Sequence, residues 1–226
     1  MNQLTSMNQL SNLGSKPSLK QLVYENLQNM IIRGELEPGS KLTEDELAQS
    51  MNISRAPIRE ALNMLERDGF TKIIPRKGAI VAEVTVKDAR DIWKCRLALE
   101  PFAAREALPN IPREEMEAAL AHLKELETHS YSFKDYVDSD LEVHALYTKH
   151  LDNEYLKSIL HNLKAHSTRV RWVKEAKNAH SARSYDTILE HKAIVEAFLS
   201  GDGDLVYIRV REHLQKSADR LLDLED

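Results

Sequence analysis

Cysteine, glycine and proline are all scarce in this chain, and each shortage excludes something. The single cysteine, Cys95, rules out a disulfide within the chain. Seven glycines and seven prolines in 226 residues are too few for a turn-rich, all-β protein. The composition therefore favours a mainly α fold built from long helices.

Long apolar stretches are missing as well. No segment approaches the roughly 20 apolar residues that span a bilayer, and the start of the chain lacks the basic residues and apolar run of a secretion signal. We therefore expect a cytoplasmic protein without membrane contact. Residues 1–17 are polar and contain MNQL twice, which predicts a disordered arm and leaves the translation start open between Met1 and Met7.

Residues 18–84 change from a helical to a strand-like pattern, and we expect them to form a first domain. Apolar residues repeat at helical intervals over 19–33 and again over 54–67. A short helix is expected between these segments, because the Thr-x-x-Glu spacing of a capping box precedes it. Strand formers then flank residues 75–78, the expected tip of a hairpin. This order of elements predicts a winged helix-turn-helix.

Basic residues gather where such a domain would meet DNA. The whole chain has a net charge of −5, but residues 52–78 carry six basic and three acidic side chains. The third helix of this motif enters the major groove by its N-terminal end, and the arginine fork pairs with guanine or with a phosphate. The predicted DNA contacts are Ser54, Arg55, Pro57, Arg59, Arg76, Lys77 and Gly78. The alternative is that these arginines only solvate a surface helix.

This segment also resembles the DNA-binding domain of GntR-type regulators. The matching features are Pro38-Gly39, Leu42, Glu46-Leu47-Ala48, Ser54-Arg55, Pro57, Arg59-Glu60-Ala61-Leu62, Leu65, Gly69 and Gly78. The resemblance implies that Arg55, Arg59 and the wing tip contact operator DNA. We expect a homodimer that supplies one recognition helix to each half of a palindromic operator.

Residues 85–226 are helical almost throughout, and we expect a second domain there. Short breaks separate the helical stretches, which predicts an antiparallel helical bundle. The six expected helices cover about 86–107, 112–128, 133–150, 153–178, 184–199 and 203–223.

One carboxylate and three imidazoles stand out in this bundle. Asp140 and His144 are four residues apart, so they lie on one helix face, while His191 and His213 belong to the last two helices. Such a set in a bundle core can hold a divalent metal and leave positions free for a small oxygen ligand. From spacing alone, the alternative stays open that these are hydrogen-bonded core histidines.

The second domain resembles the FCD-type effector domain of the FadR branch of GntR regulators. Its markers are residues 92–107, 140–156, 190–202 and 210–214. Metal-binding members carry ligands at the positions of Asp140, His144, His191 and His213, so the resemblance implies Zn²⁺ or Ni²⁺ at these four residues. The remaining histidines match no ligand position and are expected to be structural or exposed, with His150 and His166 as candidates for the cavity wall.

The resemblance further implies a pocket for an effector. Arg96 matches an arginine that pairs with carboxylate effectors; the alternative is a surface salt bridge with Glu100, four residues on. Tyr147, one turn after His144, is a candidate for the pocket wall. Six helices rather than seven argue against a fatty acyl-CoA effector and favour a small organic acid.

These features predict a DNA-binding repressor whose operator affinity is modulated by a small carboxylate at a metal site. One alternative is a regulator that responds to the metal itself, and another is a metal-dependent hydrolase with the same ligands. A hydrolase needs a general base beside the metal. Glu190 and Glu142 are available, but helical direction can turn each away from the pocket, and the chain has no nucleophile elbow or Gly-rich phosphate loop. We therefore expect no enzymatic activity.

Overall fold

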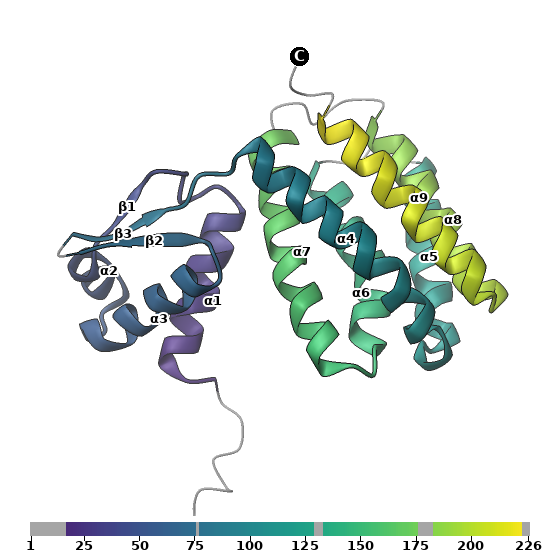
Figure 1. Ribbon diagram of the computed structural model, residues 1–226. Helices are drawn as coiled ribbons and strands as arrows, with labels where there is room; N and C mark the ends of the chain where they lie inside the picture. The colour runs from purple at the N-terminus through teal and green to yellow at the C-terminus, as the bar shows by residue number, and fades with distance from the viewer. Residues whose placement is uncertain (1–16, 76, 129–132, 176–182, 223–226) are drawn as a thin grey trace, which may run out of the picture. The chain divides into compact units, whose positions relative to one another are not determined.

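The structure is a computed structural model, shown in Figure 1. The residues that it describes are 17–75, 77–128, 133–175 and 183–222. The predicted arm lies outside the described residues except for its last position. The described chain divides into a first unit, made of residues up to 31 together with 35–83, and a second unit that runs from Val84 onward and includes 32–34.

The first unit combines helices with a small sheet. Its elements are α1 (Leu19–Ile32), β1 (Lys41–Leu42), α2 (Glu44–Met51), α3 (Arg55–Arg67), β2 (Thr71–Ile74) and β3 (Gly78–Val81). The apolar positions of α3 that recur at helical spacing are all buried in the core of this unit: Ile58, Ala61, Leu62 and Leu65. The predicted winged helix-turn-helix is confirmed.

The capping box predicted at the start of α2 is only half formed. Thr43 is the N-cap residue, and its hydroxyl accepts a hydrogen bond from the Glu46 backbone N–H at 3.3 Å. The Glu46 carboxylate accepts a bond from the Thr43 hydroxyl and not from the Thr43 backbone N–H. One free N–H of the first turn is therefore satisfied in the expected way.

The sheet has one strand more than the sequence analysis predicted. β3 lies in the middle and pairs antiparallel with β2 on one side and with β1 on the other. β1 has only two residues, with Lys41 opposite Ile80. A strand this short contains no alternation that a periodicity search could detect.

The second unit is a helical bundle. Its elements are α4 (Val86–Ala107), a 3₁₀ turn (Leu108–Asn110), α5 (Arg113–Thr128), α6 (Phe133–His150), α7 (Glu154–Glu175), α8 (Arg183–Ser200) and α9 (Gly203–Leu222). These helices match the six expected segments within a few residues, which confirms the predicted bundle. Among the described residues, no helix has the length and apolar character that crossing a membrane requires.

The packing of the bundle brings distant segments together. α4 packs along α9 and α7, α5 packs on α8, and α6 contacts both α4 and α8 (Figure 1). Most of the core is apolar, and its small side chains Ala103, Ala104 and Ala107 come from α4. The interior also buries a group of charged and imidazole side chains on α4, α6, α7, α8 and α9, and several of these side chains form the site described next.

Candidate functional site

The N-terminal end of α3 is open to solvent. Ser54 is its exposed N-cap residue, but the Ser54 hydroxyl makes no capping hydrogen bond. Pro57 lies in the first turn, where no backbone N–H is needed. The Arg55 and Arg59 side chains are one turn apart and 65% and 64% exposed. Both guanidinium groups can therefore reach an external anion.

The hairpin between β2 and β3 forms the wing. Lys77 and Gly78 lie at its turn, where the Lys77 N–H donates to the Ile74 carbonyl at 2.9 Å, and Arg76 lies outside the described residues. Gly78 has a φ of +90°, and a Cβ there would lie 2.3 Å from the Leu42 carbonyl oxygen of β1. The sheet itself therefore requires glycine at this position, a reason that the sequence analysis did not consider.

The recognition helix and the wing line a common groove of about 490 Å³. Arg55 and Arg59 contribute from α3, Lys77 and Gly78 from the wing, and Lys41 from β1. The structure thus brings four of the seven predicted DNA contacts to one surface. The geometry and charge of this groove suit a nucleic-acid backbone.

Two acidic residues at the start of α2 line the same groove. Arg59 donates from Nε and Nη2 to the two carboxylate oxygens of Glu44, each at 2.8 Å. Asp45 Oδ1 lies 2.5 Å from Arg55 Nε. Neither pair was predicted from the sequence, because the members of each pair belong to different helices and no local spacing relates them.

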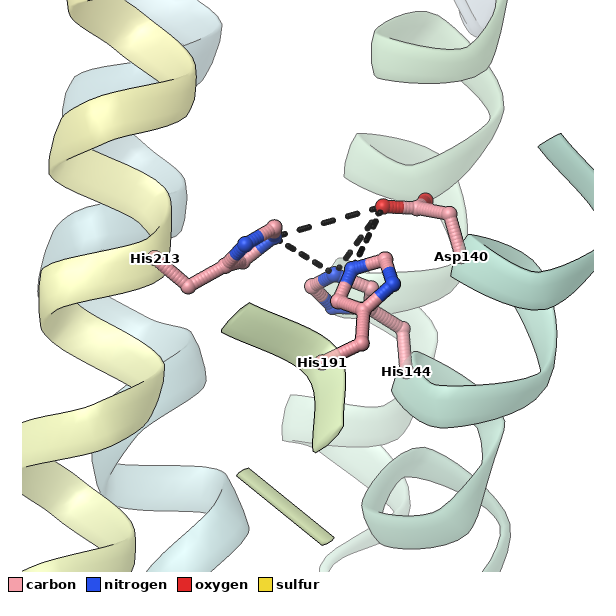
Figure 2. Close-up of side chains that lie close together, drawn as sticks. All are labelled: Asp140, His144, His191 and His213. Atoms are coloured by element: carbon pink, nitrogen blue, oxygen red, sulfur yellow. Dashed lines mark hydrogen bonds and ion pairs between the residues drawn. The ribbon is translucent and has the colours of Figure 1, made fainter. Parts of the chain in front are cut away.

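A second cluster lies inside the bundle of the second unit. Asp140 and His144 come from α6, His191 from α8 and His213 from α9, and all four side chains are buried. One potential ligand atom from each lies within 4.8 Å of all the others (Figure 2). The structure therefore brings together all four residues that the sequence analysis selected as metal ligands.

The four side chains converge on a common point. Asp140 Oδ1 lies 3.3 Å from His191 Nε2, 3.5 Å from His144 Nε2 and 4.0 Å from His213 Nε2. The Nε2 atoms of His144 and His213 are 3.3 Å apart. Figure 2 shows the three rings and the carboxylate directed at one another from three helices, α6, α8 and α9. This is the donor set that borderline divalent metals prefer.

Buried polar atoms without hydrogen bonds indicate whether the cluster fits a metal. Asp140 Oδ1 and both ring nitrogens of His191 are buried and make no hydrogen bond, a situation that costs free energy. A cation held by Asp140 Oδ1 and the three Nε2 atoms would satisfy the carboxylate oxygen and one of these nitrogens. The residues present thus fit a divalent metal.

Carboxylates outside the cluster orient two of its imidazoles. Glu100 Oε2 lies 2.8 Å from His144 Nδ1, and Glu190 Oε2 lies 2.9 Å from His213 Nδ1. When Nδ1–H donates to a carboxylate, the tautomer is set so that Nε2 carries a lone pair toward the centre. The other oxygen of Asp140 accepts from Arg171 Nη1. Arg171 was not anticipated from the sequence, and Glu100 and Glu190 were considered only in other roles.

Burial and neighbouring charges shift the pKa values of the four residues in different directions. Burial lowers the pKa of His191, and it lowers the pKa of His213 to about 3 although Glu190 favours the charged form. Both rings are therefore neutral and can coordinate a metal. Burial also opposes the charged forms of His144 and Asp140, but there the neighbouring charges prevail. Asp140 and Glu100 raise the pKa of His144, while Arg171 and His144 hold the pKa of Asp140 well below its usual range.

Arg96 is linked to the Asp–His cluster through Glu100. Its Nε donates to Glu100 Oε1 at 2.5 Å, and the Tyr147 hydroxyl donates to Glu100 Oε2, beside His144 Nδ1. The salt bridge considered for Arg96 and Glu100 is present, but it is not at the surface, because the two side chains are only 3% and 6% exposed. Arg96 Nη1 is buried and has no hydrogen-bond partner.

The two glutamates considered as general bases do not face the centre. Glu190 lies on the Nδ1 side of His213, where Arg220 also donates to both of its carboxylate oxygens. Glu142 is 2.5 Å from His122 and partly exposed. Among the described residues, His150 pairs with Glu115 and lies outside the cluster, while His129 and His180 are outside the described residues. Neither glutamate is therefore placed to act as a general base at the centre of the cluster.

Two family models match this chain. Residues 19–81 match the model described as bacterial regulatory proteins, gntR family, and residues 91–216 match the FCD domain. Together the matches cover the winged helix-turn-helix and most of the helical bundle. Asp140, His144, His191 and His213 all lie within the FCD match.

Known proteins resemble the chain over most of its length. The gluconate operon transcriptional repressor of Bacillus subtilis is 29% identical over 221 residues, which cover 93% of this chain and 88% of the relative. The solved structure of McbR/YncC from E. coli has a TM-score of 0.76 at 19% identity, with 93% of this chain and all of that chain covered. The Zn²⁺-bound FCD domain of TM0439 has a TM-score of 0.53 at 20% identity and covers 63% of this chain and 96% of that domain.

Proposed function

From the premise that this chain belongs to the GntR family of bacterial regulatory proteins and carries an FCD domain, we propose the following mechanism. The protein is a DNA-binding transcriptional regulator and not an enzyme. It acts as a homodimeric repressor on a palindromic operator. A small carboxylate, bound at a divalent metal in the second unit, modulates its affinity for that operator.

DNA binding is the task of α3 and the wing in this proposal. Ser54, Arg55, Pro57 and Arg59 at the start of α3 meet base edges and phosphates in the major groove. Lys77 and its neighbours at the wing tip contact the backbone or the minor groove. The exposure of both arginines and the groove they share with Lys77 support this assignment. The name of the Bacillus subtilis relative, a transcriptional repressor, supports repression rather than activation.

The metal would be held by Asp140, His144, His191 and His213. Imidazole and carboxylate donors suit Zn²⁺ or Ni²⁺, and the FCD domain of TM0439, which has a similar fold, was solved with Zn²⁺ bound. When bound, the ion supplies a Lewis acid that attracts an anionic oxygen ligand. Glu100 and Glu190 keep the two imidazoles that they contact in the coordinating tautomer.

The effector would engage Arg96 as well as the metal. Nη1 of Arg96 is a buried donor without a hydrogen-bond partner, and a carboxylate oxygen would complete its bonding. Tyr147 contributes to the wall of the pocket through its hydroxyl, which lies against Glu100 and His144. A ligand with two or more oxygens, such as a sugar acid or a dicarboxylate, fits these requirements.

The chain connects the effector site to the DNA-binding unit through one helix. α4 carries both Arg96 and Glu100, and only a few residues separate its start at Val86 from the end of β3 at Val81. A ligand that binds better to one arrangement of α4 than to another shifts the equilibrium between them. By linkage, the ligand then changes operator affinity by the same factor by which the operator changes ligand affinity.

The buried Asp–His cluster with its unsatisfied oxygen and nitrogens is the observation that carries the proposal. A thermal-shift series on the full chain with gluconate, citrate and lactate, each with and without EDTA, tests it. We expect at least one acid to raise the melting temperature in the metal-loaded protein and to lose this effect after chelation. His191→Ala should abolish the shift, and His161→Ala, an exposed histidine outside the cluster, should retain it.

An operator-binding assay then separates the carboxylate from the metal as signal. We expect the stabilising acid to change operator affinity while the metal stays bound. If removal of the metal alone changes operator affinity and no acid does so, the protein responds to the metal itself.

A further inference from the structure

Glu44 holds Arg59 in one orientation at the DNA-facing groove. The carboxylate receives two parallel hydrogen bonds, from Nε and Nη2, each at 2.8 Å. Its side chain is 26% exposed against 64% for Arg59, so the carboxylate is the sheltered partner and the guanidinium is the outer one. The hydrogen bond from Arg59 lowers the pKa of Glu44, which keeps the carboxylate charged.

The neighbouring pair of Arg55 and Asp45 is built differently. A single short contact links Arg55 Nε to Asp45 Oδ1, and both side chains are 65% exposed. Such a solvated pair contributes little and exchanges readily with other ions. Of these two carboxylates, only that of Glu44 therefore constrains its arginine.

The bonds to Glu44 occupy one edge of the guanidinium and leave its end open. Nε–H and one Nη2–H point to the carboxylate, while both Nη1 hydrogens and the second Nη2 hydrogen remain. The open end presents two parallel donors, one from each terminal nitrogen. Guanine offers O6 and N7 to a fork of this kind in the major groove.

We propose that Glu44 is a specificity-determining residue: it positions Arg59 end-on for a guanine edge and disfavours DNA that offers Arg59 only phosphates. This inference rests on the proposed role of Arg59 in operator contact. Glu44 acts through Arg59 and is therefore a positioning residue.

Two physical effects follow from the carboxylate. A positioned fork loses little side-chain entropy when it meets a base, which favours the cognate sequence. A fixed negative charge in the groove repels any phosphate that comes near Arg59, which weakens sequence-independent binding. Both effects raise the ratio of cognate to non-cognate affinity.

The test uses the full chain and two DNA duplexes. Wild-type protein first selects its preferred duplex from a random-sequence library, and a shuffled duplex of the same length and composition serves as the non-cognate probe. For Glu44→Gln we expect affinity for the selected duplex to fall by about 3- to 10-fold, a part of the value of a bidentate base contact. Affinity for the shuffled duplex should rise by about 2- to 5-fold, and its dependence on salt should steepen by roughly one released ion.

Matched variants separate positioning from charge and from folding. Glu60→Gln removes the same charge from α3, where Glu60 pairs with Lys20, and should leave the affinity ratio within about twofold. Glu44→Asp keeps the charge but shortens its reach, and should restore the salt dependence without restoring the full ratio. Unchanged far-ultraviolet circular dichroism of each variant confirms that α2 is intact.

The Arg59→Ala and Glu44→Gln variants distinguish failure of the DNA contact from failure of the role of Glu44. If Arg59→Ala leaves affinity for the selected duplex unchanged, the proposed DNA contact is wrong. If Arg59→Ala weakens binding but Glu44→Gln leaves both the affinity ratio and the salt dependence unchanged, the operator contact stands and the role of Glu44 is overturned.

Discussion

Arg59 of the first unit pairs with Glu44 while 64% of the arginine side chain stays exposed, whereas Arg96 of the second unit pairs with Glu100 in an interior where the two side chains are 3% and 6% exposed. Water reaches the outer face of Arg59, so a phosphate or base can bond its remaining donors while Glu44 stays in place. The second pair has lost its hydration and can exchange only with another enclosed charge. The two regions are thus suited to different ligands, a long polyanion outside and a small ion or acid inside.

Removing one member of a buried pair should have the largest effect. Glu100→Ala leaves the buried Arg96 without its carboxylate, and we expect a loss of about 3–5 kcal/mol in the free energy of unfolding, measured by urea denaturation. Glu117→Ala breaks an arginine–glutamate pair of the same i,i+4 spacing with Arg113, whose members are 69% and 56% exposed, and should cost roughly 0.5 kcal/mol or less. Equal losses would erase the distinction between buried and exposed pairs.

The next effect concerns the metal itself. Zn²⁺ at about 100 times its dissociation constant should raise the free energy of unfolding of the apo protein by about 2.7 kcal/mol, because it binds the folded state. His191→Ala should lose this stabilisation, since the ring belongs to the cluster. His161→Ala should keep it, and a similar response of the two variants would place the ion elsewhere.

A smaller effect is expected from the carboxylates that orient the ligands. Glu190→Gln weakens the contact with His213 Nδ1 and should raise the dissociation constant for Zn²⁺ by about 10- to 100-fold in a chelator competition titration. Glu115→Gln alters a comparable contact with His150, 2.9 Å long but outside the cluster. Its zinc affinity should match the wild type, and a loss of equal size would indicate a general effect on the bundle.

The smallest effect should come from the exposed wing. Lys77→Ala removes one phosphate contact, so it should weaken binding to all duplexes alike and lower the slope of log affinity against log salt by about 1. Lys20→Ala removes the same charge from α1, where Lys20 pairs with Glu60, and should leave the slope unchanged. A sequence-dependent loss in Lys77→Ala would mean that the wing reads bases.

Periodic patterns were sufficient for most of the fold. The helices of the bundle begin and end within a few residues of the predicted segments, because their apolar positions recur every three or four residues and short polar breaks separate them. The apolar face of α3 and the hairpin were predicted in the same way. The strand β1 was missed, since its two residues pair only because β3 lies beside them.

Of the two sites, the sequence predicted the main residues but not the contacts that orient them. Resemblance to a family pointed to Asp140, His144, His191 and His213, and the bundle brings these four together. Nothing in the sequence indicated that Arg171 bonds Asp140 or that Glu44 holds Arg59. Such contacts join residues of different elements, so they cannot be predicted from spacing along the chain.

By itself, the sequence determined which segments are helices and strands, which family the chain resembles and which residue types could bind a metal or DNA. Only the tertiary structure decided which carboxylate meets which arginine or imidazole, and whether each pair lies in water or in the core. The reason is physical: helix and strand patterns arise from neighbours along the chain, whereas the strength of a charged contact depends on the surrounding dielectric, which packing alone creates. The same two residue types, arginine and glutamate, therefore form a contact that stays open to solvent in one unit and an enclosed contact in the other.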